Sequence, residues 1–331
     1  MDIDKPNLFI EINDNHFNFL VGKYDEDLNF EVINKKSILS IGFKAGRITN
    51  SKDFFENIKN TILEIEKSVN YTFKETIVIL ESPSFLNINI SGFKNLNNSQ
   101  ISEDDITFII NSLKKTVSDN SNNFSIVHLF NSKFILDNKS SDNLPIGLIG
   151  NKYSHELSFF LLPSNDIKNI SATFSKINLQ INRVINKNFL EGISQVKKKG
   201  IKKFFLINLG DIKSDILFFD NSVFKYSESF NFGTHILKKD VCKVCSLSIS
   251  NVEKIFSKIN FNNSQLNDET LLNKEYFSGD LYRKISMKHI REIIEARLEE
   301  ILDLVYLKNI NLEYLQNHST EILINIEKEN I

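Results

Sequence analysis

The sequence predicts an α/β protein with two related halves, and three observations predict this fold class. Residues 8–33 alternate apolar and polar side chains in three short runs separated by polar turns, as an antiparallel meander does. The stretch FLINLGDIKSDILFF, residues 205–219, repeats the hairpin pattern around a polar turn. After each hairpin, apolar residues recur at helical spacing, so each half combines a hairpin with helices that pack on its sheet.

Composition limits the class of protein. The chain has 331 residues, of which 41% are hydrophobic and 25% charged, enough for one or two globular domains with a core. Its net charge is −2 and its charges are dispersed, which argues against a dedicated nucleic-acid-binding protein. The sequence has neither a secretory signal pattern nor a run of about 18 apolar residues. We therefore expect a cytoplasmic protein.

The first half predicts an α/β unit that is interrupted by an insertion. Residues 51–69 follow a helical apolar stripe with Ser51 as the expected N-cap, and a short buried strand follows. Over residues 84–162 the pattern changes to irregular strands around one helix. That helix begins with Ser102 and Asp105 in capping-box spacing. We expect this segment to be a compact α+β insertion.

After the insertion, the sequence predicts helices on both sides of the second hairpin. Residues 164–185 read as a helix leading to a short strand, and residues 286–306 form the best amphipathic helix of the chain. Between them, GISQVKKKGIKK (192–203) reads as a polar connector with a solvated basic run. That run consists of Lys197, Lys198, Lys199, Lys202 and Lys203.

The two cysteines form a single C-x-x-C motif, which is typical of half a zinc site or of a redox pair. Cys242 and Cys245 have no second pair, and His235 does not complete a usual metal-ligand spacing. The flanking pattern is helical. We therefore interpret both thiols as small hydrophobic residues of a helix face rather than as metal ligands.

In actin, Hsp70 and the sugar kinases, two halves with opposed hairpin turns bind the nucleotide phosphates. Each turn donates backbone N–H groups to the phosphates from one side. Four segments resemble one branch of that superfamily, the bacterial cell-division protein FtsA. They are residues 43–69 (FKAGRITNSKDFFENIKNTILEIEKSV), 127–163 (VHLFNSKFILDN to LPIGLIGNKYSHELSFFLLP), 230–241 (FNFGTHILKKDV) and 283–305 (RKISMKHIREIIEARLEEILDLV). They occur in the family's order and span most of the chain.

The resemblance implies an actin-like (ribonuclease H-like) two-lobed fold with an FtsA-type α+β insertion. The first lobe would comprise residues 1–83 and 163–196, and the insertion subdomain residues 84–162. The second lobe would comprise residues 197–331, with a helical subdomain at about 236–306. The resemblance further implies that the protein forms filaments at the inner face of the cytoplasmic membrane, at the septum. It also implies that the insertion contacts later division proteins.

The resemblance also implies that the C-terminal tail of FtsZ binds the helical subdomain. The matching positions, expected to be exposed, are Arg291, Arg297 and Glu300. A tail peptide with charges of both signs needs complementary charges beside an apolar groove. The alternative is that these charges only solvate the helix and pair along it, as Arg297 and Glu300 are spaced to do.

For this family the resemblance implies ATP with Mg²⁺ as cofactor, yet the first phosphate turn departs from the pattern. Where the family has D-x-G-[ST]-[ST]-K, this chain has residues 11–16, EINDNH. Asn13 replaces the glycine that permits close approach of a phosphate, and Asp14 adds negative charge. The turn contains no compensating lysine.

The second phosphate turn is also degenerate. Where the family has D-x-G-G-G-[ST]-[ST]-D, Asn208 replaces an acid, and an amide is a poorer partner for Mg²⁺. Asp211 and Ile212 replace two glycines. The resemblance makes Gly210, Lys213, Ser214, Asp215 and, in the following turn, Gly233 the candidate nucleotide-binding positions, and Lys213 stands where the pattern has Ser or Thr.

The family's Gly-Gly adenosine turn and basic membrane helix would follow STEILINIEKENI (319–331), where this sequence stops. That ending is acidic and apolar, which makes it a poor interfacial anchor. Either the sequence is truncated, or it belongs to a shortened relative that no longer binds ATP. The altered upstream turns favour the second explanation.

The sequence therefore favours a non-enzymatic division scaffold that binds FtsZ and binds ATP weakly or not at all. The first alternative is a working actin-like ATPase or small-molecule kinase, for which no catalytic acid and no adenosine turn are found. The second is an actin-like module of another envelope assembly, such as pilus biogenesis. The insertion at residues 84–162 counts against it.

Overall fold

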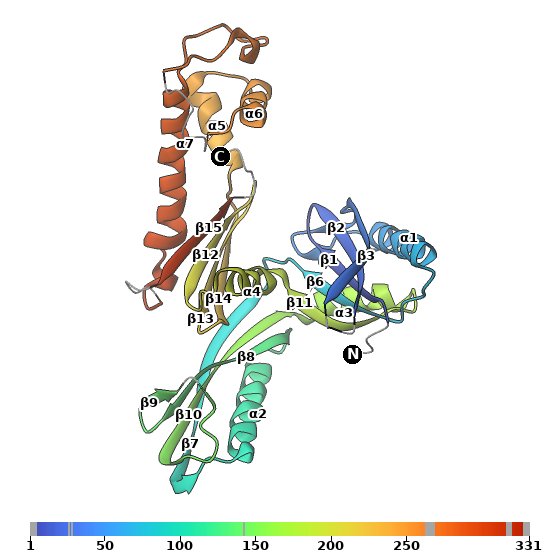
Figure 1. The fold of residues 1–331 in the computed structure, drawn as a ribbon, viewed down its shortest axis with the longest axis vertical. Coiled ribbons are helices and arrows are strands. Elements are labelled where there is room, and N and C mark those ends of the chain that lie inside the picture. Colours follow the sequence, from blue (N-terminus) through green and yellow to red (C-terminus); the bar gives the residue numbers. More distant parts are fainter. Residues whose placement is uncertain are drawn as a thin grey trace. The chain divides into compact units, whose positions relative to one another are not determined.

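The computed structural model describes residues 5–25, 27, 29–141, 143–261, 269–315 and 320–326. By internal contacts the chain divides into two compact units. The first unit comprises Met1–Lys202 and Phe219–Tyr226, and the second comprises Lys203–Phe218 and Ser227–Ile331. Figure 1 labels their elements, and each unit is considered by itself.

A five-stranded sheet forms the N-terminal part of the first unit, with the order β11-β6-β1-β2-β3. Its strands are β1 (Asn7–Ile12), β2 (His16–Tyr24), β3 (Phe30–Leu39), β6 (Glu75–Leu80) and β11 (Gln180–Asn186). The first three pair antiparallel, which confirms the predicted meander. β6 lies parallel to both β1 and β11. The carboxyl ends of these three strands therefore lie at one edge of the sheet.

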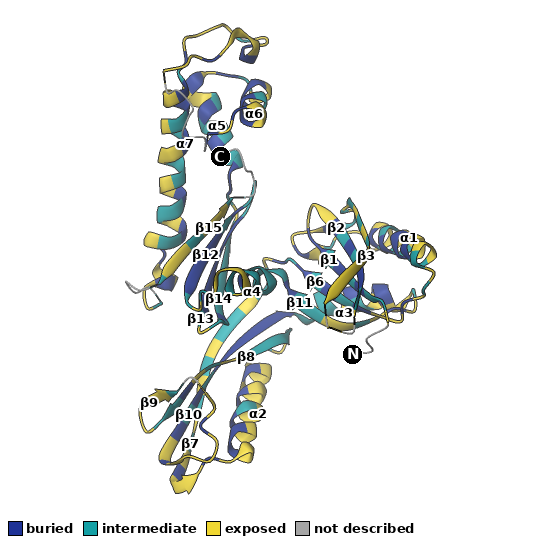
Figure 2. Cartoon of the chain, viewed as in Figure 1, coloured by how far each residue is buried: buried dark blue, intermediate teal, exposed yellow. Residues whose placement is uncertain are grey.

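Helices α1 (Ser51–Val69) and α3 (Ser164–Ser175) share one apolar core with this sheet, beside the small hairpin of β4 (Phe43–Lys44) and β5 (Arg47–Ile48). Figure 2 shows the buried side of α1 turned to the strands. The predicted N-cap of α1 is wrong by one residue. Asn50 caps the helix, because its Oδ1 accepts hydrogen bonds from the N–H groups of Lys52 and Asp53.

A second sheet is inserted between β6 and α3, with the order β7-β10-β8-β9. Its strands are β7 (Leu86–Gln100), β8 (Phe124–Leu136), β9 (Lys139–Ser141) and β10 (Ile149–Pro163). Helix α2 (Glu103–Asn120) covers one face and shares a separate core with it (Figure 1). The predicted capping box is confirmed, since Ser102 and Asp105 exchange side-chain and backbone hydrogen bonds.

The predicted polar connector is wrong. Lys187–Lys199 form helix α4, which Asn186 caps at its N-terminus and Gly200 at its C-terminus with a left-handed φ of 70°. The helix forms despite its basic end because its other face packs in the first unit. Gly192 is buried there, and a Cβ on it would lie 2.0 Å from the ring of Phe219.

The second unit contains a sheet of order β14-β13-β12-β15. Its strands are β12 (Phe204–Leu209), β13 (Ser214–Asp220), β14 (Val223–Phe230) and β15 (Glu321–Ile326). β15 lies parallel to β12, so the apolar run near the end of the sequence is a strand, as predicted. The tip of the β13–β14 hairpin belongs to the first unit, where Phe224 stacks on Phe160 with ring centroids 4.2 Å apart.

Three helices with their own apolar core complete the second unit: α5 (His235–Cys245), α6 (Ile249–Lys258) and α7 (Met287–Leu302). A short helical turn at Lys274–Tyr276 lies between α6 and α7, and another at Ile310–Leu312 follows α7. Ser286 caps α7 through the N–H of His289. The α-helix is shorter than the predicted 286–306, because its last part continues as a π-turn at Asp303–Leu307.

Both cysteines lie on α5. Cys245 is buried in the helical core and Cys242 is half-buried, and burial raises the pKa of both thiols. Among the described residues there is no group of three or more His, Cys, Asp or Glu side chains placed to hold a metal ion. The thiols are therefore held in their neutral form, as the hydrophobic interpretation requires.

Candidate functional site

The turn between β1 and β2 stands where the sequence predicts the first phosphate turn. The Oδ1 atom of Asn13 accepts hydrogen bonds from the N–H groups of Asn15 (2.9 Å) and His16 (2.8 Å). Asp14 Oδ1 accepts another from the N–H of Gly46 at 3.3 Å. A phosphate in such a turn would bind free backbone N–H groups. Here the turn's own side chains already use them.

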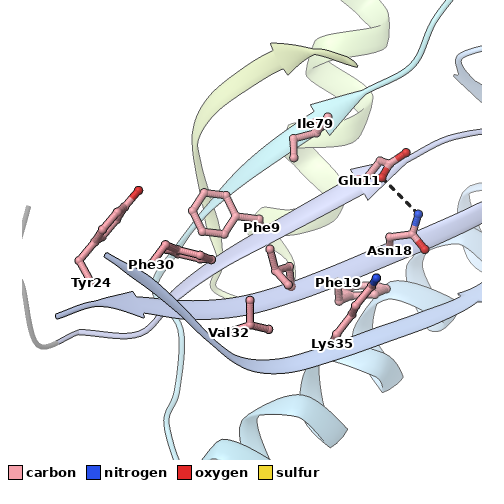
Figure 3. Close-up of a pocket in the computed structure, with 10 residues that line it drawn as sticks. Phe9, Glu11, Asn18, Phe19, Tyr24, Phe30, Val32, Lys35 and Ile79 are labelled. Atoms are coloured by element: carbon pink, nitrogen blue, oxygen red, sulfur yellow. Dashed lines mark hydrogen bonds between the residues drawn. The ribbon is translucent and has the colours of Figure 1, made fainter. Parts of the chain in front are cut away.

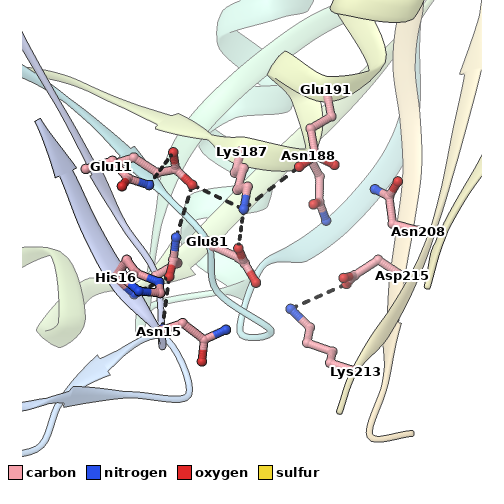
Figure 4. Close-up of polar contacts among 12 residues, drawn as sticks. Glu11, Asn15, His16, Glu81, Lys187, Asn188, Glu191, Asn208, Lys213 and Asp215 are labelled. Atoms are coloured by element: carbon pink, nitrogen blue, oxygen red, sulfur yellow. Dashed lines mark hydrogen bonds and ion pairs between the residues drawn. The ribbon is translucent and has the colours of Figure 1, made fainter. Parts of the chain in front are cut away.

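A charged cluster, named here the Lys187 cluster, lies at the edge formed by the carboxyl ends of β1, β6 and β11. Lys187 Nζ lies 3.1 Å from Glu11 Oε1 and 2.7 Å from Glu81 Oε2. Glu191, one helical turn later on α4, lies 3.9 Å from the same nitrogen. Figure 4 shows the acidic side chains directed at the ammonium group. Ligands of α/β proteins characteristically bind at this edge.

The two signs of charge in the Lys187 cluster stabilise each other. Burial by itself raises the pKa of Glu11, but Lys187 and the amides of Asn18 and Asn13 outweigh it and the pKa is lowered. Burial lowers the pKa of Lys187, yet Glu81, Glu11 and Glu191 raise it overall. Glu11 and Lys187 are therefore both held in their charged forms at neutral pH. The edge holds a fixed internal cation.

Sequence reasoning missed the Lys187 cluster. Its signal was an ionisable residue at or just after the end of each parallel strand: Glu11, Glu81 and Lys187. Only the pairing of β6 with both β1 and β11 brings these distant positions to one edge.

The turn between β12 and β13 stands where the sequence predicts the second phosphate turn, and it too is closed by internal bonds. The N–H of Gly210 donates to the carbonyl of Lys213 at 2.9 Å. Ser214 is fully buried, and its hydroxyl donates to the carbonyl of Phe232 at 2.7 Å. Asp215 accepts a hydrogen bond from Ser229 and lies 3.5 Å from Lys213 Nζ (Figure 4).

Asn208, which replaces the expected acid, accepts a hydrogen bond from the amide of Asn325 on β15 at 3.3 Å. This contact lies between the parallel strands β12 and β15. The amide thus serves the pairing of two strands in the second unit.

Gly233 brings the start of α5 against the second turn. The N–H groups of Thr234 and His235 donate to the carbonyls of Gly210 (2.9 Å) and Asp211 (2.8 Å). A Cβ on Gly233 would lie 2.3 Å from the Gly210 carbonyl oxygen, so only glycine fits. The N–H groups that an anion could use at this helix start are bound to the turn.

A nucleotide does not fit these residues. In both turns the predicted positions are present, but their donors and acceptors are engaged with each other. The cation at the carboxyl edge of the first sheet is Lys187, held by protein carboxylates. Among the described residues, these two turns therefore offer no open cradle for a phosphate.

A pocket of about 550 Å³ lies on the N-terminal sheet over β1, β2 and β3 (Figure 3). Aromatic and aliphatic side chains make up most of its lining, with Lys35 as its single basic residue. Glu11 and Asn18 lie together at one end, joined by a 3.2 Å hydrogen bond. Such a lining suits apolar groups and not a polyphosphate.

The three predicted tail-binding residues all lie on α7, but two of them are not exposed as predicted. Arg291 and Arg297 are half-buried, and only Glu300 is exposed. Arg297 forms ion pairs with Asp240 on α5 and with Glu300. The hydrogen bond to Asp240 raises the pKa of Arg297. The pairing of Arg297 with Glu300, which the alternative interpretation expects, is present in the structure.

The fold is shared with a solved structure of the PilM–PilN type IV pilus biogenesis complex. The match has a TM-score of 0.58 and covers 97% of this chain and 81% of that chain, at 8% sequence identity. Two units, each led by an antiparallel hairpin, and this match define an actin-like protein. The predicted fold class is confirmed.

No protein-family model matches the sequence. The cell division protein FtsA of Buchnera aphidicola subsp. Schizaphis graminum is 23% identical over 290 residues, which covers 86% of this chain and 68% of that protein. FtsA of Neisseria meningitidis serogroup B is 19% identical over 293 residues, covering 86% and 69%. The chain therefore has the actin-like fold and is similar in sequence to cell division proteins named FtsA.

No helix in the described part of the chain is both long enough and apolar enough to span a bilayer. Residues 327–331, part of the ending that the sequence analysis judged a poor interfacial anchor, lie outside the described residues.

Proposed function

We propose that the protein is a non-catalytic adaptor of cell division. In this proposal it links the FtsZ ring to the inner face of the cytoplasmic membrane at the septum and recruits later division proteins. Residues 1–83 with 163–196 act as the first lobe, 84–162 as the insertion that meets other division proteins, and 197–331 as the second lobe. Self-association into actin-like filaments follows from the same resemblance.

One observation carries the non-catalytic part. Asn13 Oδ1 accepts the N–H groups of Asn15 and His16, two donors that the first turn could otherwise offer to a phosphate. In the second turn, the carbonyls of Gly210 and Asp211 accept hydrogen bonds from the N–H groups at the start of α5. Phosphoryl transfer depends almost entirely on positioning and electrostatic stabilisation of phosphates. An ATPase or small-molecule kinase would need both turns open, so this alternative has no support in the geometry.

Addition of Mg²⁺-ATP is expected to leave the thermal midpoint of the protein unchanged. A ligand present at about 100 times its Kd would stabilise the folded state by about 2.7 kcal/mol, which is readily visible in a melting curve. The measurement is differential scanning fluorimetry with and without ATP, followed by titration calorimetry. Micromolar affinity for ATP would overturn the non-catalytic proposal and favour the enzyme.

The proposal places the FtsZ tail on α7, where Glu300 is the exposed member of the predicted set. The wild-type chain is expected to bind a synthetic FtsZ C-terminal tail peptide. Glu300→Lys should weaken that binding about tenfold, because it reverses a charge beside the peptide. Calorimetry or fluorescence anisotropy measures the affinity.

The matched control is Glu292→Lys, the same charge reversal at another exposed position of α7. It should leave the tail affinity unchanged. Arg297→Glu is less informative, because it would place a third carboxylate beside Asp240 and Glu300 and disturb the packing of α7 on α5. If the wild-type chain does not bind the tail peptide at all, the adaptor proposal is contradicted.

A further inference from the structure

Four lysines gather at the C-terminal end of α4 and are named here the lysine patch. Lys197, Lys198 and Lys199 form its last turn, and Lys202 follows Gly200, which ends the helix. All four side chains are exposed. Because the segment is helical and capped, the patch is a fixed feature of the first unit and not the solvated connector that the sequence predicts.

None of these four ammonium groups forms an ion pair or a hydrogen bond with any described residue. Other lysines of the first unit have acidic partners, for example Lys225 with Asp220 at 3.0 Å and Lys94 with Asp105. Moreover, the sequence contains no acidic residue between Glu191 and Asp211. The patch therefore presents uncompensated positive charge on a chain whose net charge is −2.

The dipole of helix α4 balances only part of this positive charge. Cations in a last turn are stabilised by the helix macrodipole, which is equivalent to about half a negative charge at the C-terminus. That is too little to balance three lysines in the turn and a fourth just beyond it. A partner with dense negative charge would supply the remainder.

We propose that the lysine patch binds the anionic headgroup surface of a phospholipid bilayer. The patch has no arginine to form bidentate contacts, and the next aromatic residues, Phe204 and Phe205, are fully buried. Base stacking and groove recognition in nucleic acids use such groups, whereas lysines attract a diffuse charged surface without fixed geometry. The choice of a membrane rests on the proposed adaptor function.

Cosedimentation of the full chain with vesicles tests the inference. The protein is expected to bind vesicles with about 30 mol% phosphatidylglycerol and not pure phosphatidylcholine vesicles, since each lysine near an anionic surface contributes about fivefold to partitioning. Binding should fall when NaCl is raised from about 0.1 M to about 0.5 M, because salt screens the surface potential. Lys197→Gln/Lys198→Gln/Lys199→Gln should lower the partition coefficient roughly a hundredfold.

The control is Lys114→Gln/Lys115→Gln/Lys139→Gln, which removes the same charge from exposed positions of α2 and the inserted sheet that pair with no described residue. It should bind vesicles like the wild type, and an unchanged urea midpoint shows that each variant folds. An equal loss in both variants would mean a general charge effect and overturn the inference. Tighter binding to a duplex oligonucleotide than to vesicles would replace the membrane with nucleic acid. If the wild-type chain binds the tail peptide but does not bind vesicles, the membrane inference for the lysine patch is rejected and the adaptor proposal is not.

Discussion

Replacement of Lys187 by methionine is expected to lower the free energy of unfolding of the first unit by about 3 kcal/mol. The change leaves Glu11 and Glu81 without the ammonium group that lies 3.1 Å and 2.7 Å from them. Their like charges would then repel each other in a partly buried site, and Lys187 is only 28% exposed. Urea unfolding followed by circular dichroism measures the loss.

The pH dependence separates this electrostatic effect from lost packing. The pKa of Glu11 in the folded protein lies below its ordinary value of 4.5, so its contribution is fully present above that pH and is lost as the pH falls through the folded-state pKa. Removal of Lys187 removes the cause of the lowered pKa. The difference in stability between wild type and variant should therefore be largest near neutral pH and should shrink in acid.

Two further variants sharpen the test. Lys258→Met removes an exposed lysine that lies 3.5 Å from Glu275, and should cost under about 1 kcal/mol, as surface ion pairs do. Adding Glu81→Gln to Lys187→Met should recover part of the stability, because one uncompensated carboxylate is then gone. Equal losses for Lys187→Met and Lys258→Met would contradict the role assigned to the Lys187 cluster.

Gly233→Ala is expected to destabilise the second unit by about 3 kcal/mol, which is the upper range for overpacking a tight contact. The added Cβ would lie 2.3 Å from the carbonyl oxygen of Gly210 and 2.7 Å from that of Asp211. These are backbone atoms held by the N–H groups of Thr234 and His235, so they cannot move without breaking both hydrogen bonds. Urea unfolding again provides the measurement.

Gly200→Ala is the matched control for Gly233→Ala. Gly200 has a φ of 70° but no heavy atom within 4 Å of its added Cβ, so alanine there meets only the left-handed backbone penalty of about 1 kcal/mol. The larger loss should thus occur at the glycine without a positive φ. A smaller loss at Gly233 than at Gly200 would show that the start of α5 is not fixed against the turn.

Local sequence signals predicted most elements of this protein. The alternation in residues 8–33 gave three paired strands, and the spacing of Ser102 and Asp105 gave the capping box of α2. Such signals succeed because the interactions concerned lie within one turn or one hairpin. The N-cap of α1 was missed by one residue because Asn50 and Ser51 are both good capping residues, and only the backbone angles select Asn50.

Helix α4 shows where local signals fail. Its lysines and two glycines are typical of a connector, yet Gly192 lies buried against Phe219, which is distant in the sequence. The packing of that face stabilises a helix that its composition does not favour.

The sequence by itself predicted the actin-like class and, by resemblance, two degenerate phosphate turns, because both predictions depend on which residues follow one another. In that prediction Asn13 and Asn208 stand where the family has a glycine and an acid. Only the tertiary structure decided which charged side chains meet at the edge of the first sheet. Parallel pairing brings Glu11, Glu81 and Lys187 from three distant strand ends to one edge, where an internal ammonium is held by protein carboxylates. That outcome depends on strand order, which no local pattern contains.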